Sequence, residues 1–356
     1  MTRFTLATLL AFGLVSGNEV TTEYTSKRAL RIEVTSEFHV ETVDFSMERD
    51  GEPVDVGADA GPATDSTRTV VMIDTVLEEK DGVPTLVQRE FEEISARATM
   101  MMRGEESEIE QECPLAGVTL ELSLDGEEVT ADVLEGSEPD DDRLLEDHAM
   151  TVALDALLPE MEVEPGDSWE ISREDLGRAL GFDMDPVLFP RPERDEREAG
   201  DDERGGRRRG GRGARGGAPG AGRYFSIGDW DVEATLGDET EVYDGQVCYV
   251  IAIEAEGSGG VPERGEGGRG RGRGGRAMEL ASSTLPLEGT FEAQLEGDLY
   301  FSVAGRHPVH FEMEGEFIVN MQREMERRGS SMSMSSTQEG LLEYSVEISP
   351  IALDEG

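Results

Sequence analysis

The sequence predicts a mainly β (α+β) protein, built as one long curved antiparallel sheet or half-barrel in which two meanders pack around a central helix. Three observations lead to this fold class: hydrophobicity alternates with a period of two in both halves, turn residues separate the alternating runs, and one stretch between the halves has helical spacing. Strands with one apolar and one charged face are typical of antiparallel sheets with one face in water. The alternative is two sandwich domains that meet at the helix.

The alternation is clearest in residues 285–321, where odd positions are almost all apolar or Gly and many even positions are Glu or Asp. This pattern predicts half-buried strands. Residues 304–308 are the expected reversal, and residues 342–348 are expected to continue the sheet. Three glycines within the stretch are predicted to mark bends or bulges: Gly289, Gly297 and Gly315.

The first half of the chain alternates in the same way. The apolar positions are even in residues 30–40 and odd in residues 43–47, which predicts a β-bulge between the two runs. Further odd-numbered apolar runs occupy 71–77, 87–91 and 129–133, and an even-numbered one occupies 118–124. Asp125-Gly126 predicts a hairpin between the strands on either side of it, and residues 79–82 (EKDG) predict another turn.

Residues 142–158 break this alternation. Their apolar residues recur at helical spacing, no Gly or Pro interrupts them, three Asp residues lie at their start and Pro159 follows. They are therefore predicted to form the central helix. A Pro-Gly turn at 163–169 should deliver Trp169 to a strand, and a second short helix is expected at 173–180.

The N-terminus has the three parts of a secretory signal: a positive charge at Arg3, an apolar run at 4–15, and small residues near Gly17. The run is shorter than the ~20 residues that cross a bilayer. Residues 1–17 are therefore the predicted signal peptide, and the mature protein is expected to have no transmembrane segment. It would be exported to the periplasm, the cell surface or the medium. The alternative is a buried first strand or helix.

The predicted organisation after the signal peptide has three parts. An N-terminal meander occupies 18–141, a central helical segment occupies 142–181, and a C-terminal meander occupies 182–356. Two Arg/Gly-rich insertions, at about 191–223 and 257–276, interrupt the C-terminal part. Gly-rich segments bury too little apolar area to offset the entropy of ordering, so flexible loops are predicted.

The charge of the chain excludes some functions. The sequence has 79 Asp+Glu against 32 Lys+Arg, a formal net charge of −47, which argues against a surface that binds nucleic acid over its whole extent. The 4 His and 2 Cys leave little material for a metal or nucleophile site. The sequence has no serine elbow, Walker loop, dinucleotide fingerprint or paired-Cys zinc pattern. A non-enzymatic protein without catalytic, cofactor-binding or metal-binding residues is predicted.

The His and Met residues support this prediction. His307 and His310 are three residues apart on an expected strand and should point to opposite faces. His148 lies beside the apolar stripe of the predicted helix, and His39 lies on the polar side of its strand. Methionines that could suggest copper are expected to fill the strand core instead: Met100, Met101, Met102, Met332 and Met334.

The arginines of the two insertions have two interpretations. They bind a polyanion such as nucleic acid, acidic polysaccharide or anionic lipid, or they are solvated spacers drawn to the acidic body. No aromatic residue is interleaved with the Arg-Gly repeats, although stacking on bases needs one. The candidate polyanion-binding residues are Arg204, Arg207, Arg208, Arg209, Arg212, Arg215, Arg269, Arg271, Arg273 and Arg276.

Cys113 and Cys248 form a candidate disulfide, because an exported chain matures in an oxidising compartment. If the meanders are parts of one continuous sheet, the two segments could be neighbours and the bond would join the two halves. Such a bond would stabilise the fold by a few kcal/mol. The alternative is two separate reduced thiols.

Residues 158–169 (LPEMEVEPGDSW) resemble an "LP…V..GD.W" signature of uncharacterised bacterial exported proteins, which pair it with later "G…Y" and "G.L.F" strands. Residues 245–250 (GQVCYV) and 296–301 (EGDLYF) stand in those places. The expected architecture is also similar to the lipoprotein-carrier type of half-barrel, in which a curved sheet wraps helices. The resemblance covers most of 25–350 apart from the insertions, and it implies no catalytic residue.

Two functions follow. The first is a non-enzymatic exported protein whose curved apolar sheet face holds a lipid-like or polymeric ligand. The alternative is a polyanion-binding surface factor that acts through its Arg/Gly-rich loops.

Overall fold

The computed structural model describes residues 20–55, 61–102, 105–126, 128–146, 148–182, 188–189, 225, 228–261, 284–327 and 330–351. These residues form 13 strands. The strands before the central segment are β1 (Arg28–Arg49), β2 (Glu52–Pro53), β3 (Ala63–Lys80), β4 (Val83–Met102), β5 (Glu105–Glu112), β6 (Thr119–Asp125) and β7 (Glu128–Glu135). The later ones are β8 (Ser168–Glu170), β9 (Asp229–Tyr243), β10 (Gln246–Gly260), β11 (Thr284–Ser302), β12 (His307–Arg327) and β13 (Ser330–Ile351).

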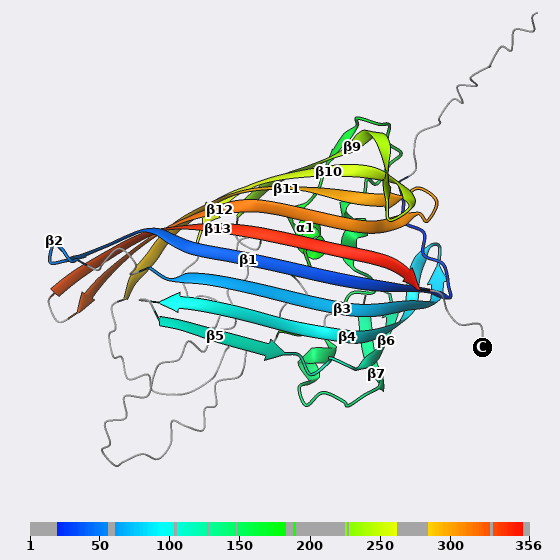
Figure 1. Ribbon diagram of the computed structural model, residues 1–356, viewed down its shortest axis with the longest axis horizontal. Helices are drawn as coiled ribbons and strands as arrows, with labels where there is room; N and C mark the ends of the chain where they lie inside the picture. Colours follow the sequence, from blue (N-terminus) through cyan, green and yellow to red (C-terminus); the bar gives the residue numbers. More distant parts are fainter. Residues whose placement is uncertain are drawn as a thin grey trace, which may run out of the picture.

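All 13 strands belong to one antiparallel sheet (Figure 1). The order is β7-β6-β4-β3-β1-β13-β12-β11-β10-β9-β8, with β2 added to β1 and β5 added to β4. The sheet is not closed, since β7 and β8 end the order in the described part of the chain. The predicted fold class, a mainly β protein with a long curved antiparallel sheet, is confirmed, and the alternative of two sandwich domains is wrong.

The first and last strands join the two meanders. β1 pairs with β13 from Ala29↔Ile351 to Arg49↔Met332, and β1 pairs with β3 on its other side. The register of β1 on β13 shifts between Thr42 and Asp44. This irregularity confirms the bulge that the change of phase after residue 40 predicts.

The turns also agree with the sequence. Asp81 and Gly82, between β3 and β4, have φ angles of 55° and 79°. Two left-handed residues in succession are what a two-residue type I′ hairpin requires. Gly126, with φ of 71°, follows the end of β6 at the predicted Asp-Gly turn.

Of the bends or bulges predicted at the glycines of the C-terminal half, no bulge lies at Gly297 or Gly315. The register shifts of the β11–β12 pair lie between Thr284 and Leu287 and between Tyr300 and Phe301, away from Gly297 and Gly315. A Cβ atom on Gly297 would collide with the carbonyl oxygen of Glu312, and one on Gly315 with that of Gln294. These glycines therefore permit close approach of neighbouring backbones in the curved sheet.

The predicted central helix at 142–158 is wrong. The segment contains two short 3₁₀ helices, Asp142–Leu145 and Ala153–Leu157, with no helix between them in the described residues. The buried Arg89 guanidinium binds the carbonyl oxygens of Ala149 (3.0 Å) and Met150 (3.4 Å). Because these two carbonyls accept hydrogen bonds from an arginine of the sheet, they are not used for the backbone hydrogen bonds of a continuous α-helix. The second predicted helix is present as α1 (Arg173–Ala179), which Ser172 caps.

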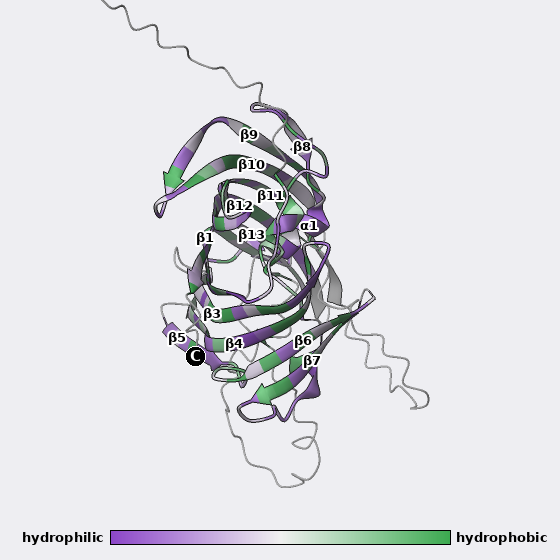
Figure 2. Ribbon diagram, turned by 90° about the vertical axis from the view of Figure 1, so that its right-hand side faces the viewer, coloured by the Kyte–Doolittle hydropathy of each residue, from purple (hydrophilic) through white to green (hydrophobic). Residues whose placement is uncertain are grey.

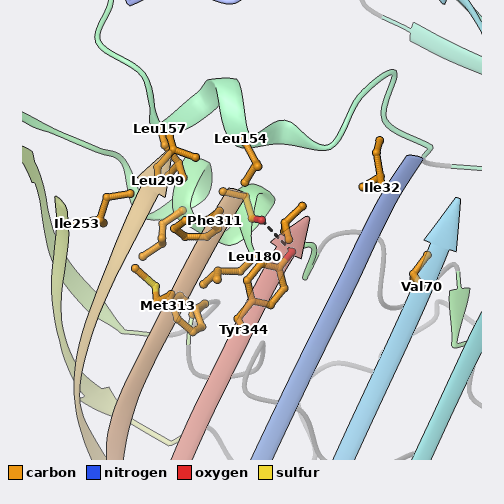
Figure 3. Packing of buried hydrophobic residues seen from close by; sticks show 14 of the residues in the cluster. Ile32, Val70, Leu154, Leu157, Leu180, Ile253, Leu299, Phe311, Met313 and Tyr344 are labelled. Carbon is orange, nitrogen blue, oxygen red and sulfur yellow. Dashed lines mark hydrogen bonds between the residues drawn. The ribbon is translucent and has the colours of Figure 1, made fainter. Parts of the chain in front are cut away.

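The concave face of the sheet holds the core. Figure 2 shows the sheet curving around α1, with β8 and β9 on one side of the opening and β6 and β7 on the other. Leu154, Leu157 and Leu180 of the central segment pack against Phe311 and Met313 of β12 (Figure 3). The central segment thus fills much of the concavity. Among the described residues no helix is long and apolar enough to cross a membrane.

The predicted disulfide is wrong, because Cys113 and Cys248 are both free and buried. Cys113 lies beside β4, where its N–H donates to Ile94, and Cys248 lies in β10. Six strand-to-strand steps separate β4 from β10 in the sheet order, about 29 Å along the sheet at ~4.8 Å a step. A disulfide needs Cα atoms within about 7 Å. Burial raises the pKa of both thiols.

Candidate ligand-binding site

An apolar hollow lies on the concave face, between the sheet and the central segment. Its volume is about 70 Å³. The sheet supplies one wall from strands β1, β3 and β13: Val34, Ser36, Arg68, Val70, Met72 and Tyr344. The central segment and the residues after it supply the other wall: Ala149, Thr151, Val152, Ala153, Arg178, Leu180, Gly181, Phe182, Leu188 and Phe189.

Small side chains leave room for the hollow. Four residues form one row across the sheet, each directly opposite the next: Ala96, Arg68, Ser36 and Tyr344. Ala96 and Ser36 fill little of the space above the sheet in this row. In the adjoining row Phe38 is buried and packs edge-on against Phe317 at 5.9 Å between ring centroids. The hollow therefore lies over a row of the sheet in which the small Ala96 and Ser36 alternate with the larger Arg68 and Tyr344.

The wall formed by the central segment is fixed by polar side chains of the sheet. Arg89, fully buried, donates to both carboxylate oxygens of Asp74 (2.7 and 2.6 Å) and to the carbonyls of Ala149 and Met150. The two charges are direct cross-strand neighbours, and burying either one alone would be costly. The Tyr344 hydroxyl donates to the Ala179 carbonyl (3.0 Å) at the end of α1.

An aromatic cluster lies next to the hollow. Phe182 packs against Phe225 at 4.8 Å between ring centroids, and Phe225 stacks on Trp230 at 4.2 Å. Phe225 also meets Phe317 of the sheet at 6.5 Å. Residues far apart in the sequence therefore converge over the concave face.

Two arginines belong to the hollow. The Arg68 guanidinium lies 5.5 Å from the ring centroid of Phe189, in cation–π geometry. Arg178, on α1, donates to Asp175 at 3.3 Å, and its side chain is 58% exposed. Neither arginine stands out in the pattern of the sequence.

The register of β3 explains the omission of Arg68. Of the odd-numbered core positions predicted for this strand, Val71 is buried but Leu77 is 36% exposed. The buried row is otherwise even-numbered and includes Val70, Met72 and Val76. Residues 70–73 are Val-Val-Met-Ile, so both faces are apolar and the alternation gives no phase. Two residues in the sequence could have identified the buried face: Asp74 on β3 and Arg89 on β4. They carry opposite charges, and the other positions on their face of each strand are largely apolar.

The convex face has a second, polar hollow of about 610 Å³. Its charged lining residues are all acidic: Glu37, Glu254, Glu296, Asp298, Glu312, Glu314 and Glu343. Burial, followed by the charges of Glu312 and Glu241, raises the pKa of Asp298. Among the described residues no group of three or more His, Cys, Asp or Glu side chains is arranged to hold a metal ion.

The two histidines of β12 contact different partners. The His307 ring accepts a hydrogen bond from Arg28, whereas His310 stacks on Tyr243 at 4.6 Å between ring centroids and lies 2.9 Å from Glu347.

The other two histidines also have structural contacts. His148 is buried and donates to the Leu144 carbonyl at 2.8 Å. His39 lies 2.5 Å from Asp65 on the exposed side of its strand.

The predicted Met core is only partly present. Met100, Met332 and Met334 are partly buried, but Met101 is 50% exposed and so does not fill the core. Met102 ends β4, and its side chain is outside the described part.

Several predicted features lie outside the described residues. These are the signal peptide at 1–17, the insertion at 191–223, and the insertion at 257–276 apart from residues 257–261, which lie at the end of β10 or directly after it. All ten candidate polyanion-binding arginines, from Arg204 to Arg276, fall in these parts. Their role stays a prediction.

No protein-family model and no curated protein matches the chain. Among solved structures it is similar to the outer membrane protein OprG from Pseudomonas aeruginosa, with 6% identity and a TM-score of 0.20 over 91% of this chain and 97% of that chain. It is also similar to OccK7 (OpdD) from Pseudomonas aeruginosa, with 6% identity and a TM-score of 0.24 over 92% and 100% of the two chains. Similarities this low carry no argument about the fold or function.

Proposed function

We propose that this chain is an exported, non-enzymatic binding protein that holds a lipid-like ligand on the concave face of its sheet. The observation that carries the proposal is the apolar hollow between β1, β3 and the central segment. The N-terminal sequence supports export, because residues 1–17 have the order of charge, apolar run and small residues of a secretory signal.

The size of the hollow indicates how a ligand would enter. Its volume of about 70 Å³ corresponds to roughly five water-sized groups at about 10–15 Å³ each. A longer alkyl chain therefore has to displace part of the central segment. Residues 149–158 of this segment lie on the sheet without pairing with a strand, so the strand ladder stays intact when they move.

The energies permit this displacement. Burial of ten methylene groups would contribute about 8 kcal/mol at ~0.8 kcal/mol each. Loss of the side-chain contacts to the carbonyls of Ala149, Met150 and Ala179 would cost about 0.5–3 kcal/mol per hydrogen bond. The three hydrogen bonds together would cost about 1.5–9 kcal/mol, so an alkyl chain of ten methylene groups offsets their loss over most of this range.

The proposal is tested with an uncharged apolar fluorophore, 1-N-phenylnaphthylamine, and the full mature chain. We expect saturable binding that hexadecanol competes with. Val70→Phe and Ser36→Phe place a ring in the hollow and should each weaken fluorophore binding at least tenfold. Thr35→Phe, one residue away on the other face of β1, is the matched control and should leave the affinity unchanged.

Thermal unfolding of each variant verifies that it is folded. If Val70→Phe does not fold, Ser36→Phe decides the test, because its position is only half-buried. Equal affinities of the wild-type chain, Ser36→Phe and Thr35→Phe would show that the fluorophore binds elsewhere, and the proposed function would then be wrong.

A further inference from the structure

Three methionines lie together near the end of the sheet where β2 joins β1 (Figure 1). Met47 of β1 is directly opposite Met334 of β13, and Met332 is two residues from Met334 on the same face. Directly opposite residues have Cβ atoms about 4.5–5.5 Å apart, and diagonal neighbours at about 7–8 Å are within reach of long side chains. A methionine side chain has three rotatable bonds, so the three sulfur atoms can meet at one point above the sheet.

Core packing does not explain this cluster. Met47, Met332 and Met334 are partly buried, but among the described residues they neither belong to the buried core nor pack against it. On the same face of β13, the core contains Leu342 and Val346. The apolar residue type therefore changes from branched to methionine where the core ends.

Hydrogen bonds fix the backbone that carries the cluster. The Ser46 and Ser335 hydroxyls, on the other face of the same strands, share a hydrogen bond of 2.7 Å. Where β1 ends, the Asp50 N–H donates to the Ser331 carbonyl (2.9 Å), and the Asp50 carboxylate accepts from the Ser331 N–H (2.8 Å) and the Ser330 hydroxyl (2.9 Å). Assembly of a site therefore requires only rotation of side chains.

The chemistry of the cluster favours one class of metal ion. Thioether sulfur is a soft, neutral ligand that suits Cu(I), whereas Mg²⁺ and Ca²⁺ prefer oxygen. Arg323 lies opposite Met334, and Arg49 lies opposite Met332, and their charges disfavour a divalent ion more than a monovalent one. The formal net charge of −47 attracts cations to the chain as a whole.

We propose that Met47, Met332 and Met334 form a binding site for one Cu(I) ion, with their three sulfur atoms as ligands. The site is separate from the apolar hollow, because β1 runs from Ser36 at the hollow to Met47 over about 36 Å at ~3.3 Å per residue. It gives Met332 and Met334 a role other than the expected filling of the core.

The experiment titrates Ag(I) into the full mature chain with ¹³C-labelled methionine methyl groups. Ag(I) has the charge and softness of Cu(I) and keeps one oxidation state. We expect three methyl resonances to shift together, and the single variants Met47→Leu, Met332→Leu and Met334→Leu identify them, since each lacks one resonance. The titration continues to three equivalents, so that the two free thiols, Cys113 and Cys248, cannot take up all of the ion.

The affinity for Cu(I) is then measured without oxygen, by competition with bicinchoninate, at the same methyl resonances. Met47→Leu and Met334→Leu keep an apolar side chain and remove one sulfur. Each should weaken binding about tenfold or more, because loss of even an outer-shell partner typically costs 10–100-fold in metal affinity.

Met101→Leu is the matched control, because Met101 is 50% exposed and lies opposite Ala63 and Glu106. It should leave the affinity for Cu(I) unchanged. Thermal unfolding verifies that each variant is folded, and the partial exposure of Met47 and Met334 makes both positions tolerant of leucine.

The inference is wrong if the three methyl resonances do not shift by three equivalents of Ag(I). It is also wrong if Met47→Leu and Met334→Leu both bind Cu(I) as tightly as the wild type, or if Met101→Leu loses as much affinity as they do. Fluorophore binding at the apolar hollow does not depend on these methionines, so this inference and the proposed function can fail separately.

Discussion

The concave and convex faces of this sheet are built from alternate residues of the same strands, but their charged side chains are arranged in opposite ways. The concave face buries paired opposite charges, and the convex face aligns like charges. On the concave face, Arg89 and Asp74 are buried as a bidentate pair within the apolar core. On the convex face a row of five glutamates crosses five strands, each directly opposite the next: Glu254, Glu296, Glu314, Glu343 and Glu37.

The difference shows which face holds the sheet together. Like charges directly opposite one another in a sheet are destabilising, so the glutamate row cannot contribute to the pairing of its strands at neutral pH. The same strands bury Ile253, Leu295, Phe311 and Leu342 on the other face. Burial there offsets the repulsion on the convex face, which water and salt also weaken.

The largest effect is expected from breaking the buried pair. Arg89→Met leaves the Asp74 carboxylate buried without its partner and should lower the free energy of unfolding by about 3–5 kcal/mol. The double variant Arg89→Met with Asp74→Leu removes both charges and should recover most of the loss. Urea unfolding measures all three chains.

Arg97→Met is the matched control for the convex side, because Arg97 pairs with Glu108 and Glu110 while 65% exposed. Its expected effect is below about 1 kcal/mol. Equal losses for Arg89→Met and Arg97→Met would contradict the contrast between the faces.

An intermediate effect is expected at His307, near the end of the sheet where β12 begins. Burial and the charge of Arg28 lower the pKa of His307 from 6.5 to about 4. A guanidinium only donates, so the neutral ring accepts the bond from Arg28. Protonation would remove this bond and place two cations together.

The sign of the pH dependence follows from the lowered pKa. Between pH 6.5 and 4 the unfolded chain binds the proton and the folded chain does not, so stability falls as the pH falls through this window. The contribution of His307 at pH 4.5 is a loss of about 2–3 kcal/mol relative to neutral pH. His307→Gln cannot titrate there. Its stability should therefore fall less than that of the wild type, and parallel pH profiles of the two chains would disprove the assignment.

The smallest effect is expected in the glutamate row. Glu314→Gln removes one charge that faces Glu296 and Glu343 and should stabilise the protein by about 0.2–1 kcal/mol at low salt. At 1 M salt, where the screening length is about 3 Å, the gain should vanish. Glu110→Gln, which removes a partner of Arg97, should have the opposite sign, and a gain of equal size there would contradict the role of like-charge repulsion.

Local patterns predicted the sheet well. The alternation of β12, the change of phase in β1 and the Asp-Gly turn after β3 each depend on neighbouring residues, and the structure confirms them. The candidate site was not predictable in the same way. Arg68 and Arg178 are 110 positions apart in sequence, and only the packing of α1 against the sheet brings them to one hollow.

The prediction of a long helix at 142–158 failed for a related reason. Its helical spacing is present in the sequence, but the carbonyls of Ala149 and Met150 have a competing partner in Arg89, about 60 positions earlier. A buried guanidinium requires acceptors from whichever segment covers it. Helical periodicity contains no information about that requirement.

The sequence by itself determined the strands, their turns and the separation of an apolar from an acidic face, because a period of two is a local property of the chain. Tertiary structure alone decided that β1 and β13 join the two meanders, that Cys113 and Cys248 lie far apart along the sheet, and that two arginines border an apolar hollow. Strand order and the packing of the central segment depend on contacts between residues far apart in the sequence, and a local period of two contains no information about those contacts.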